Sequence, residues 1–62
     1  MNQKVEASEV KVGDKIKIGR QFHTVVSKYT YMGSIRMVSK NPVTNNRVNH
    51  TWAPDHLLTV DD

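Results

Sequence analysis

The sequence predicts an all-β domain, a small five-stranded barrel, and three observations support this prediction. Charged and apolar residues alternate with a period of two in Lys15–Ile18, and the same alternation returns in Ser34–Lys40. Between them, Gln21–Lys28 is rich in β-branched and aromatic residues, which favour strands. Its alternation is imperfect, which indicates a bulge near Thr24 and Val25 or a strand covered on both faces. Turn-forming glycines, Gly19 and Gly33, separate the three segments. We therefore expect a meander of antiparallel strands with one face buried and the other in solvent.

Two more strands are expected at Arg47–Trp52 and Leu57–Val60. The segment Asn41–Asn46 is predicted to be a hairpin loop, because its proline cannot donate to a strand ladder and its asparagines tolerate left-handed geometry. Ala53–His56 is predicted to form a single 3₁₀ turn, since its proline presets φ and the run is too short for an α-helix. The polar residues 1–6 are expected to be frayed.

The chain of 62 residues is expected to form one domain spanning 1–62. A domain of this size buries only about 60% of the surface of its unfolded chain, so its stability should be marginal. The absence of cysteine excludes a disulfide framework and a thiolate zinc site. The polar start and the lack of a long apolar run predict a cytoplasmic protein without export signal or membrane contact.

The charges are distributed unevenly along the chain. Nine basic and six acidic residues give a net charge of +3, and every acid lies outside residues 15–54. The acids are Glu6, Glu9, Asp14, Asp55, Asp61 and Asp62. The body of the predicted barrel is therefore basic, which favours binding of polyanions, of which nucleic acid is the commonest.

The alternation also predicts which side chains form a binding face. The residues expected to point inward are Ile16, Ile18, Ile35 and Met37, which leaves the neighbouring cations, together with His23, pointing outward. The cations would neutralise phosphates, and tyrosines in the loop expected after the second strand would stack on bases. The candidate nucleic-acid-binding residues are Lys15, Lys17, Arg20, Lys28, Tyr29, Tyr31, Arg36, Lys40 and Arg47.

Patterns typical of enzymes and metal sites are missing from the sequence. The histidines, His23, His50 and His56, do not have a recognised ligand spacing. No serine stands in a Gly-x-Ser-x-Gly turn, and the isolated glycines form no phosphate-binding loop. The sequence therefore predicts a non-enzymatic binding module without a cofactor or a metal.

Several short segments match a known small barrel in their order along the chain. They are Val12–Ile16, Phe22, Val25, Val26, Thr44–Thr51 and Asp55–Val60. With five short strands and a turn before the fifth, they resemble an SH3-like barrel, in particular the KOW-like N-terminal domain of translation elongation factor P. The resemblance implies a barrel that grips RNA, DNA or the proteins around them. That family carries a modified lysine in a Lys-Pro-Gly-Lys loop, whereas the corresponding Tyr29–Gly33 contains no lysine, so the elongation-factor activity does not transfer.

A second hypothesis is a protein-interaction module. Val25, Val38, Met32 and the tyrosines would form an apolar patch rimmed by cations, as partner sites often do. Such a module would be an adaptor or an inhibitor, of the kind encoded by phages and mobile elements, and would dock on an acidic surface of a larger enzyme. The partner is thus RNA or DNA, or an acidic protein surface, and the chain is expected to be a monomer or a weak homodimer.

Overall fold

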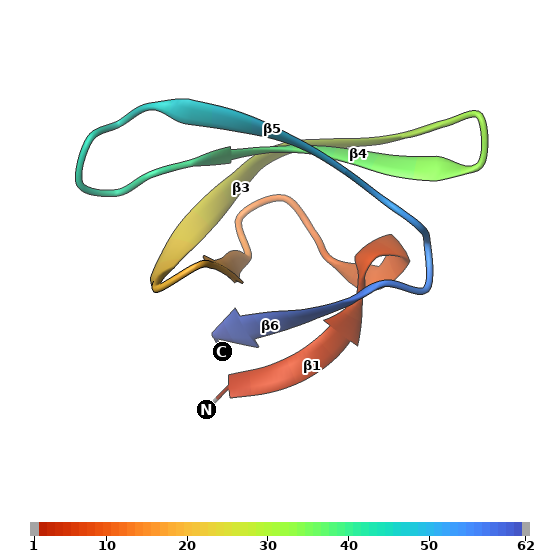
Figure 1. Ribbon diagram of the computed structural model, residues 1–62, viewed down its shortest axis with the longest axis horizontal. Coiled ribbons are helices and arrows are strands. Elements are labelled where there is room, and N and C mark those ends of the chain that lie inside the picture. Colours follow the sequence, from red (N-terminus) through yellow and green to blue (C-terminus); the bar gives the residue numbers. More distant parts are fainter. Residues whose placement is uncertain (1, 62) are drawn as a thin grey trace.

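The computed structural model describes residues 2–61 and is all-β, with six antiparallel strands in a single sheet (Figure 1). The elements are β1 (Asn2–Glu6), the 3₁₀ helix η1 (Ala7–Glu9), β2 (Lys15–Ile18), β3 (Gln21–Tyr31), β4 (Ser34–Lys40), β5 (Arg47–Trp52) and β6 (Leu57–Asp61). Their order in the sheet is β1-β6-β2-β3-β4-β5. None of the helical structure in residues 2–61 has the length and apolar character needed to cross a bilayer. Met1 and Asp62 lie outside the described residues.

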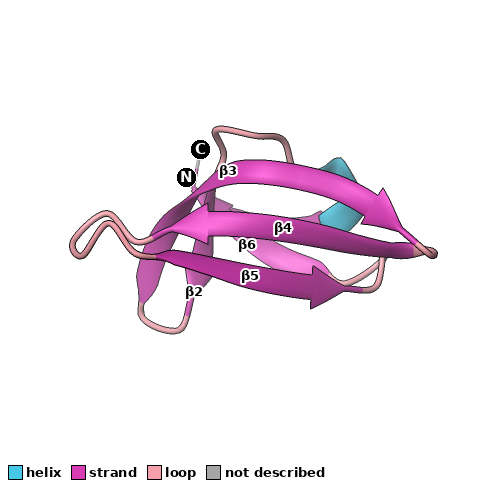
Figure 2. Cartoon of the chain, turned by 90° about the horizontal axis from the view of Figure 1, so that it is seen from above, coloured by secondary structure: helices cyan, strands magenta, loops and turns pink. Residues whose placement is uncertain are grey.

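The long strand β3 turns the sheet over on itself. Its first part pairs with β2 and the rest pairs with β4, and the β3–β4 register shifts between Val25 and Ser27. Such a bulge bends a strand and increases its twist. As a result β3, β4 and β5 form one layer, and β1 and β6 lie in a second layer across from it (Figures 1 and 2).

The core lies between the two layers and is built from alternate strand positions. Ile35 and Met37 point inward, as the period-two pattern predicts, and Ile16 is fully buried beside them. The buried apolar side chains are Ala7, Val10, Ile16, Val25, Ile35, Met37, Leu58 and Val60. Val5, Ile18 and Trp52 are half-buried and pack against this cluster.

The prediction that residues 1–6 are frayed is wrong for residues 2–6, which form β1. This strand pairs with β6 along its whole length, and Val5 lies opposite Leu58. Without β1, the edge of β6 would be unpaired and Leu58 would lose an apolar neighbour. The sheet therefore has six strands, where the sequence pattern predicts five.

The sheet is open, because the strand order leaves β1 and β5 as its two edges. The predicted 3₁₀ turn at Ala53–His56 is a tight turn instead, closed by the His56 N–H donating to the Ala53 carbonyl at 3.0 Å. The 3₁₀ helix is η1, whose Ala7 N–H donates to the His56 carbonyl at 2.8 Å. Together η1 and this turn link the layers at one end of the molecule.

The β3–β4 hairpin has a two-residue turn of strained geometry. Met32 and Gly33 both have positive φ, 49° and 79°. Two left-handed residues match the twist of the flanking strands, but only glycine, asparagine and aspartate adopt this conformation readily. Because the turn is so short, the predicted loop Tyr29–Gly33 is mostly strand, and Tyr29 and Tyr31 belong to β3.

Replacing Met32 with asparagine should stabilise the domain by roughly 1 kcal/mol, because asparagine tolerates the left-handed region. Met32 is 87% exposed, so the substitution removes no core contact. The free energy of unfolding in urea measures the effect. Gly33→Ala is the matched control and should destabilise, since alanine opposes positive φ. Equal stability of Met32→Asn and the parent would contradict the inference that the backbone is strained at Met32.

Met37→Ala should cost about 2–5 kcal/mol, because Met37 is only 1% exposed and its removal leaves a cavity in the core. In a domain of this size that loss is a large part of the total stability. Urea denaturation followed by tryptophan fluorescence provides the measurement. Val43→Ala, at a position that is 73% exposed, should leave the midpoint nearly unchanged. A Met37→Ala midpoint equal to that of Val43→Ala would overturn the core assignment.

Candidate nucleic-acid interface

One side of the β3-β4-β5 layer, named here the outer face, faces solvent (Figure 2). Cross-strand partners share a side of a sheet, so the pairings of the three strands define it, opposite the side that buries Ile35 and Met37. Its members are Thr24, Ser27, Tyr29, Tyr31, Ser34, Arg36, Val38, Lys40, Arg47, Asn49 and Thr51. The outer face therefore carries cations, and none of its strands contains an aspartate or a glutamate.

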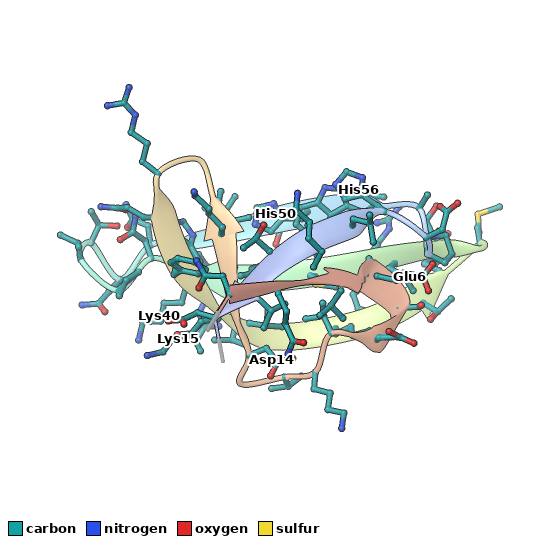
Figure 3. The ribbon with its side chains drawn as sticks, turned by 90° about the horizontal axis from the view of Figure 1, so that it is seen from below. Glu6, Asp14, Lys15, Lys40, His50 and His56 are labelled. Atoms are coloured by element: carbon teal, nitrogen blue, oxygen red, sulfur yellow. The ribbon has the colours of Figure 1, made fainter. Side chains whose placement is uncertain are left out.

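A cationic row crosses the outer face at one end. Lys40 lies between Thr24 on β3 and Arg47 on β5, and Thr24 in turn pairs with Lys15 on β2. Lys15 and Lys40 accordingly lie at the same end of the molecule (Figure 3). Asp61 on β6 is the next residue of this row, opposite Lys15. Lys40 and Arg47 lie farther from this carboxylate than Lys15 does, so it offsets their charge less.

An aromatic row lies farther along the same strands. Tyr29 pairs with Arg36, which pairs with Thr51. The guanidinium of Arg36 also lies 4.5 Å from the ring centre of Tyr31, a cation–π contact. Each tyrosine is half exposed. Two aromatic rings are thereby held on a rigid strand, with the Arg36 cation beside them.

A shallow cavity lies where the aromatic row meets the middle row of Ser27, Val38 and Asn49. Its volume is about 130 Å³, well below the roughly 300–1,000 Å³ of pockets that enclose drug-sized ligands. It is lined by Tyr29, Arg36, Met37, Val38, Asn49, His50 and Thr51. The lining of the cavity therefore combines apolar side chains with an amide and a hydroxyl.

Five of the nine predicted site residues come together on the outer face. They are Tyr29, Tyr31, Arg36, Lys40 and Arg47, and Lys15 extends their cationic row. Asn49 and Thr51 were not predicted as site residues, although the alternation in the fifth predicted strand already places them on the same side as Arg47.

The remaining predicted residues lie elsewhere. Lys17 is exposed on β2 opposite Phe22, and Arg20 is exposed in the β2–β3 turn. Lys28 pairs with buried Met37 on the inner side, and its Nζ donates to the Ser8 carbonyl at 2.6 Å. The bulge in β3 explains the orientation of Lys28, because one extra residue in a strand moves each later side chain of that strand to the opposite face of the sheet.

His23 was expected to point outward and is instead 5% exposed in the core. Its Nδ1 lies 3.4 Å from Ser39 Oγ, which also lies 2.8 Å from His50 Nε2. A hydroxyl can donate to one ring nitrogen and accept from another, so each buried polar group has a partner. Ser39 is 0% exposed and so out of reach of an external substrate. The linked side chains His23, Ser39 and His50, called here the polar chain, serve the packing of β3, β4 and β5.

His50, the last member of the polar chain, also belongs to a stack of three aromatic rings. The His50 and Trp52 rings lie 4.6 Å apart at 7°, and the Trp52 and His56 rings lie 5.6 Å apart at 3°. His50 and His56 thus lie on either side of the indole along one side of the molecule (Figure 3). Within residues 2–61, no group of three histidine or carboxylate side chains is placed to hold a metal ion.

Comparison with protein-family models, curated proteins and solved structures gives no match to this chain. The inference of function therefore rests on the chemistry of the outer face.

The buried polar chain should make the domain sensitive to mild acid. Burial lowers the pKa of His50 below the usual 6.5, and charge on His23 lowers that pKa further. The unfolded chain then binds more protons at His50 than the folded one, so the contribution of His50 to stability is fully present above pH 6.5 and is lost as the pH falls below it. Urea midpoints at about pH 7.5 and about pH 5.5 measure this difference.

In His50→Gln this dependence on pH should be reduced, because glutamine does not titrate. His56→Gln is the matched control at an exposed histidine and should retain the dependence seen in the parent. A parent domain that becomes more stable between these two pH values on acidification would contradict the assignment.

Proposed function

We propose that this protein is a non-enzymatic nucleic-acid-binding module that uses the outer face of β3, β4 and β5. The observation that carries the proposal is the meeting of three cations and two half-exposed tyrosines on a face whose strands contain no acid. Cations neutralise phosphates and release counterions, and aromatic rings stack on bases. A phosphate-bearing polymer with flat bases is the ligand that satisfies both.

The rigidity of the face supports the same function. Arg36 is already held against Tyr31, and Lys40 and Arg47 lie on directly paired strands. Neighbouring strands are about 4.8 Å apart, so the cationic row presents closely spaced charges in a line. Side chains held in place in this way lose less conformational entropy on binding than side chains in a mobile loop.

We also propose that the fold is a variant of the SH3-like barrel. Five strands, β2 to β6, follow one another in the expected order, with a tight turn before the last. In this interpretation β1 is an addition that covers the outer edge of β6.

A protein-interaction module is the second candidate, and the exposed Met32 beside Tyr31 at the tip of the β3–β4 hairpin favours it. An apolar tip of this kind fits a pocket on a partner protein. The nucleic-acid proposal ranks first because it uses the cations as well as the rings.

Fluorescence anisotropy with labelled single-stranded DNA and RNA tests the proposal. Binding should weaken steeply with added salt, by about 0.7 in log K per log salt for each phosphate contact. Lys40→Ala and Arg47→Ala should each weaken binding and reduce this slope by roughly one contact, with little loss of stability, because both side chains lie on the outer face and neither belongs to the buried core.

Lys4→Ala is the matched control, since Lys4 is an exposed cation on β1, in the other layer. It should bind as the parent does. If no nucleic acid binds the parent, or if Lys4→Ala weakens binding as much as Arg47→Ala, the outer face is not a nucleic-acid site. A cellular protein that co-purifies after nuclease treatment would then favour the docking module.

A further inference from the structure

We infer that the ligand of the outer face is a single strand, and that the cavity beside Tyr29 takes one unpaired base stacked on the Tyr29 ring. This inference rests on the proposed function and adds to it the form of the nucleic acid and the place of the base. It follows from the arrangement of the rows on the outer face.

The first step is the separation of charge from aromatic surface. Lys40 and Arg36 lie four residues apart on β4, on the same side, so their rows are about 13 Å apart along the strand. The middle row between them, Val38 with Asn49 opposite, carries no charge. A strand whose phosphates follow the cationic row would direct its bases over the middle row toward Tyr29.

The second step concerns the shape of the face. A duplex keeps its bases stacked inside, and its major groove admits an α-helix or a two-stranded ribbon. The outer face is three strands wide and its rings lie on the surface of the sheet, so they reach only bases that are already unstacked. Sheet platforms with exposed aromatic rings suit single strands for this reason.

The third step assigns roles within the cavity. Both tyrosines are half exposed, but only Tyr29 lines the cavity, whereas Tyr31 lies outside it and has Arg36 over one face of its ring. Asn49 and Thr51 line the same cavity and offer an amide and a hydroxyl to the edge of a base. Tyr29 therefore provides affinity for any base, and Asn49 is positioned to provide preference among them.

The test compares four labelled ligands of equal length, about 12 nucleotides. They are single-stranded DNA, the matching single-stranded RNA, the DNA duplex, and a DNA strand of abasic sites with the same phosphates. The intact single strands should bind roughly tenfold more tightly than the abasic strand, since stacking is lost there. The DNA and RNA arms show which sugar the site prefers.

Variants of Tyr29 locate the stacked base. Tyr29→Ala should lower affinity for intact strands roughly tenfold and leave the affinity for the abasic strand and the salt slope unchanged. Tyr29→Phe is the control that keeps the ring and should bind as the parent does. Circular dichroism and urea midpoints of both variants verify folding.

Equal binding of the intact strand, the duplex and the abasic strand by the parent would overturn the base-stacking inference. Salt-dependent binding in that case would leave the proposed function standing. Equal losses for intact and abasic strands in Tyr29→Ala would likewise overturn it. If none of the four ligands binds, the proposed function and this inference fall together.

Discussion

The structure depends on the bend in β3. A single sheet has two faces, and the helical structure in residues 2–61 is the three-residue η1, too short to cover either face, so the chain buries its core by folding the sheet over on itself. The register shift between Val25 and Ser27 is where this happens. It brings Ile35 and Met37 of β4 into one buried cluster with Ile16 of β2 and Leu58 of β6.

The same bend determines which side chains are left for function. After the bulge, Lys28 faces inward and reaches Ser8, whereas Tyr29 faces solvent with Arg36. Inside, β4 and β5 bury a polar chain through Ser39 and His50, so the three strands are joined by side-chain hydrogen bonds as well as by their backbones. The outer face is therefore a stiff platform, and stiffness favours the binding of a flexible polymer because less order must be gained on the protein side.

Much of this fold follows from alternation alone. The limits of β2, β4 and β5 agree with the period-two patterns, and the side of Arg36 and Arg47 follows from them. Three features do not follow from the alternation. β1 is polar, and only its pairing with β6 makes Asn2–Glu6 a strand. The imperfect alternation of the second predicted strand indicates a bulge near Thr24 and Val25, close to the observed shift between Val25 and Ser27, but it does not show that the bulge turns Lys28 inward. His23 is buried because Ser39 lies within reach of its ring and of His50, and these residues are far apart in the sequence.

The antiparallel pairing of β1 with β6 has a practical consequence. Asn2 and Asp61 are cross-strand partners, so the two ends of the described chain lie side by side, across the molecule from β4 and β5 (Figure 1). A tether attached at either end leaves Tyr29, Tyr31 and Arg36, which lie on β3 and β4, unobstructed. The same proximity allows a short linker to join the ends, with new termini opened in the exposed residues 42–46 between β4 and β5, giving a circular permutant with the same sheet order.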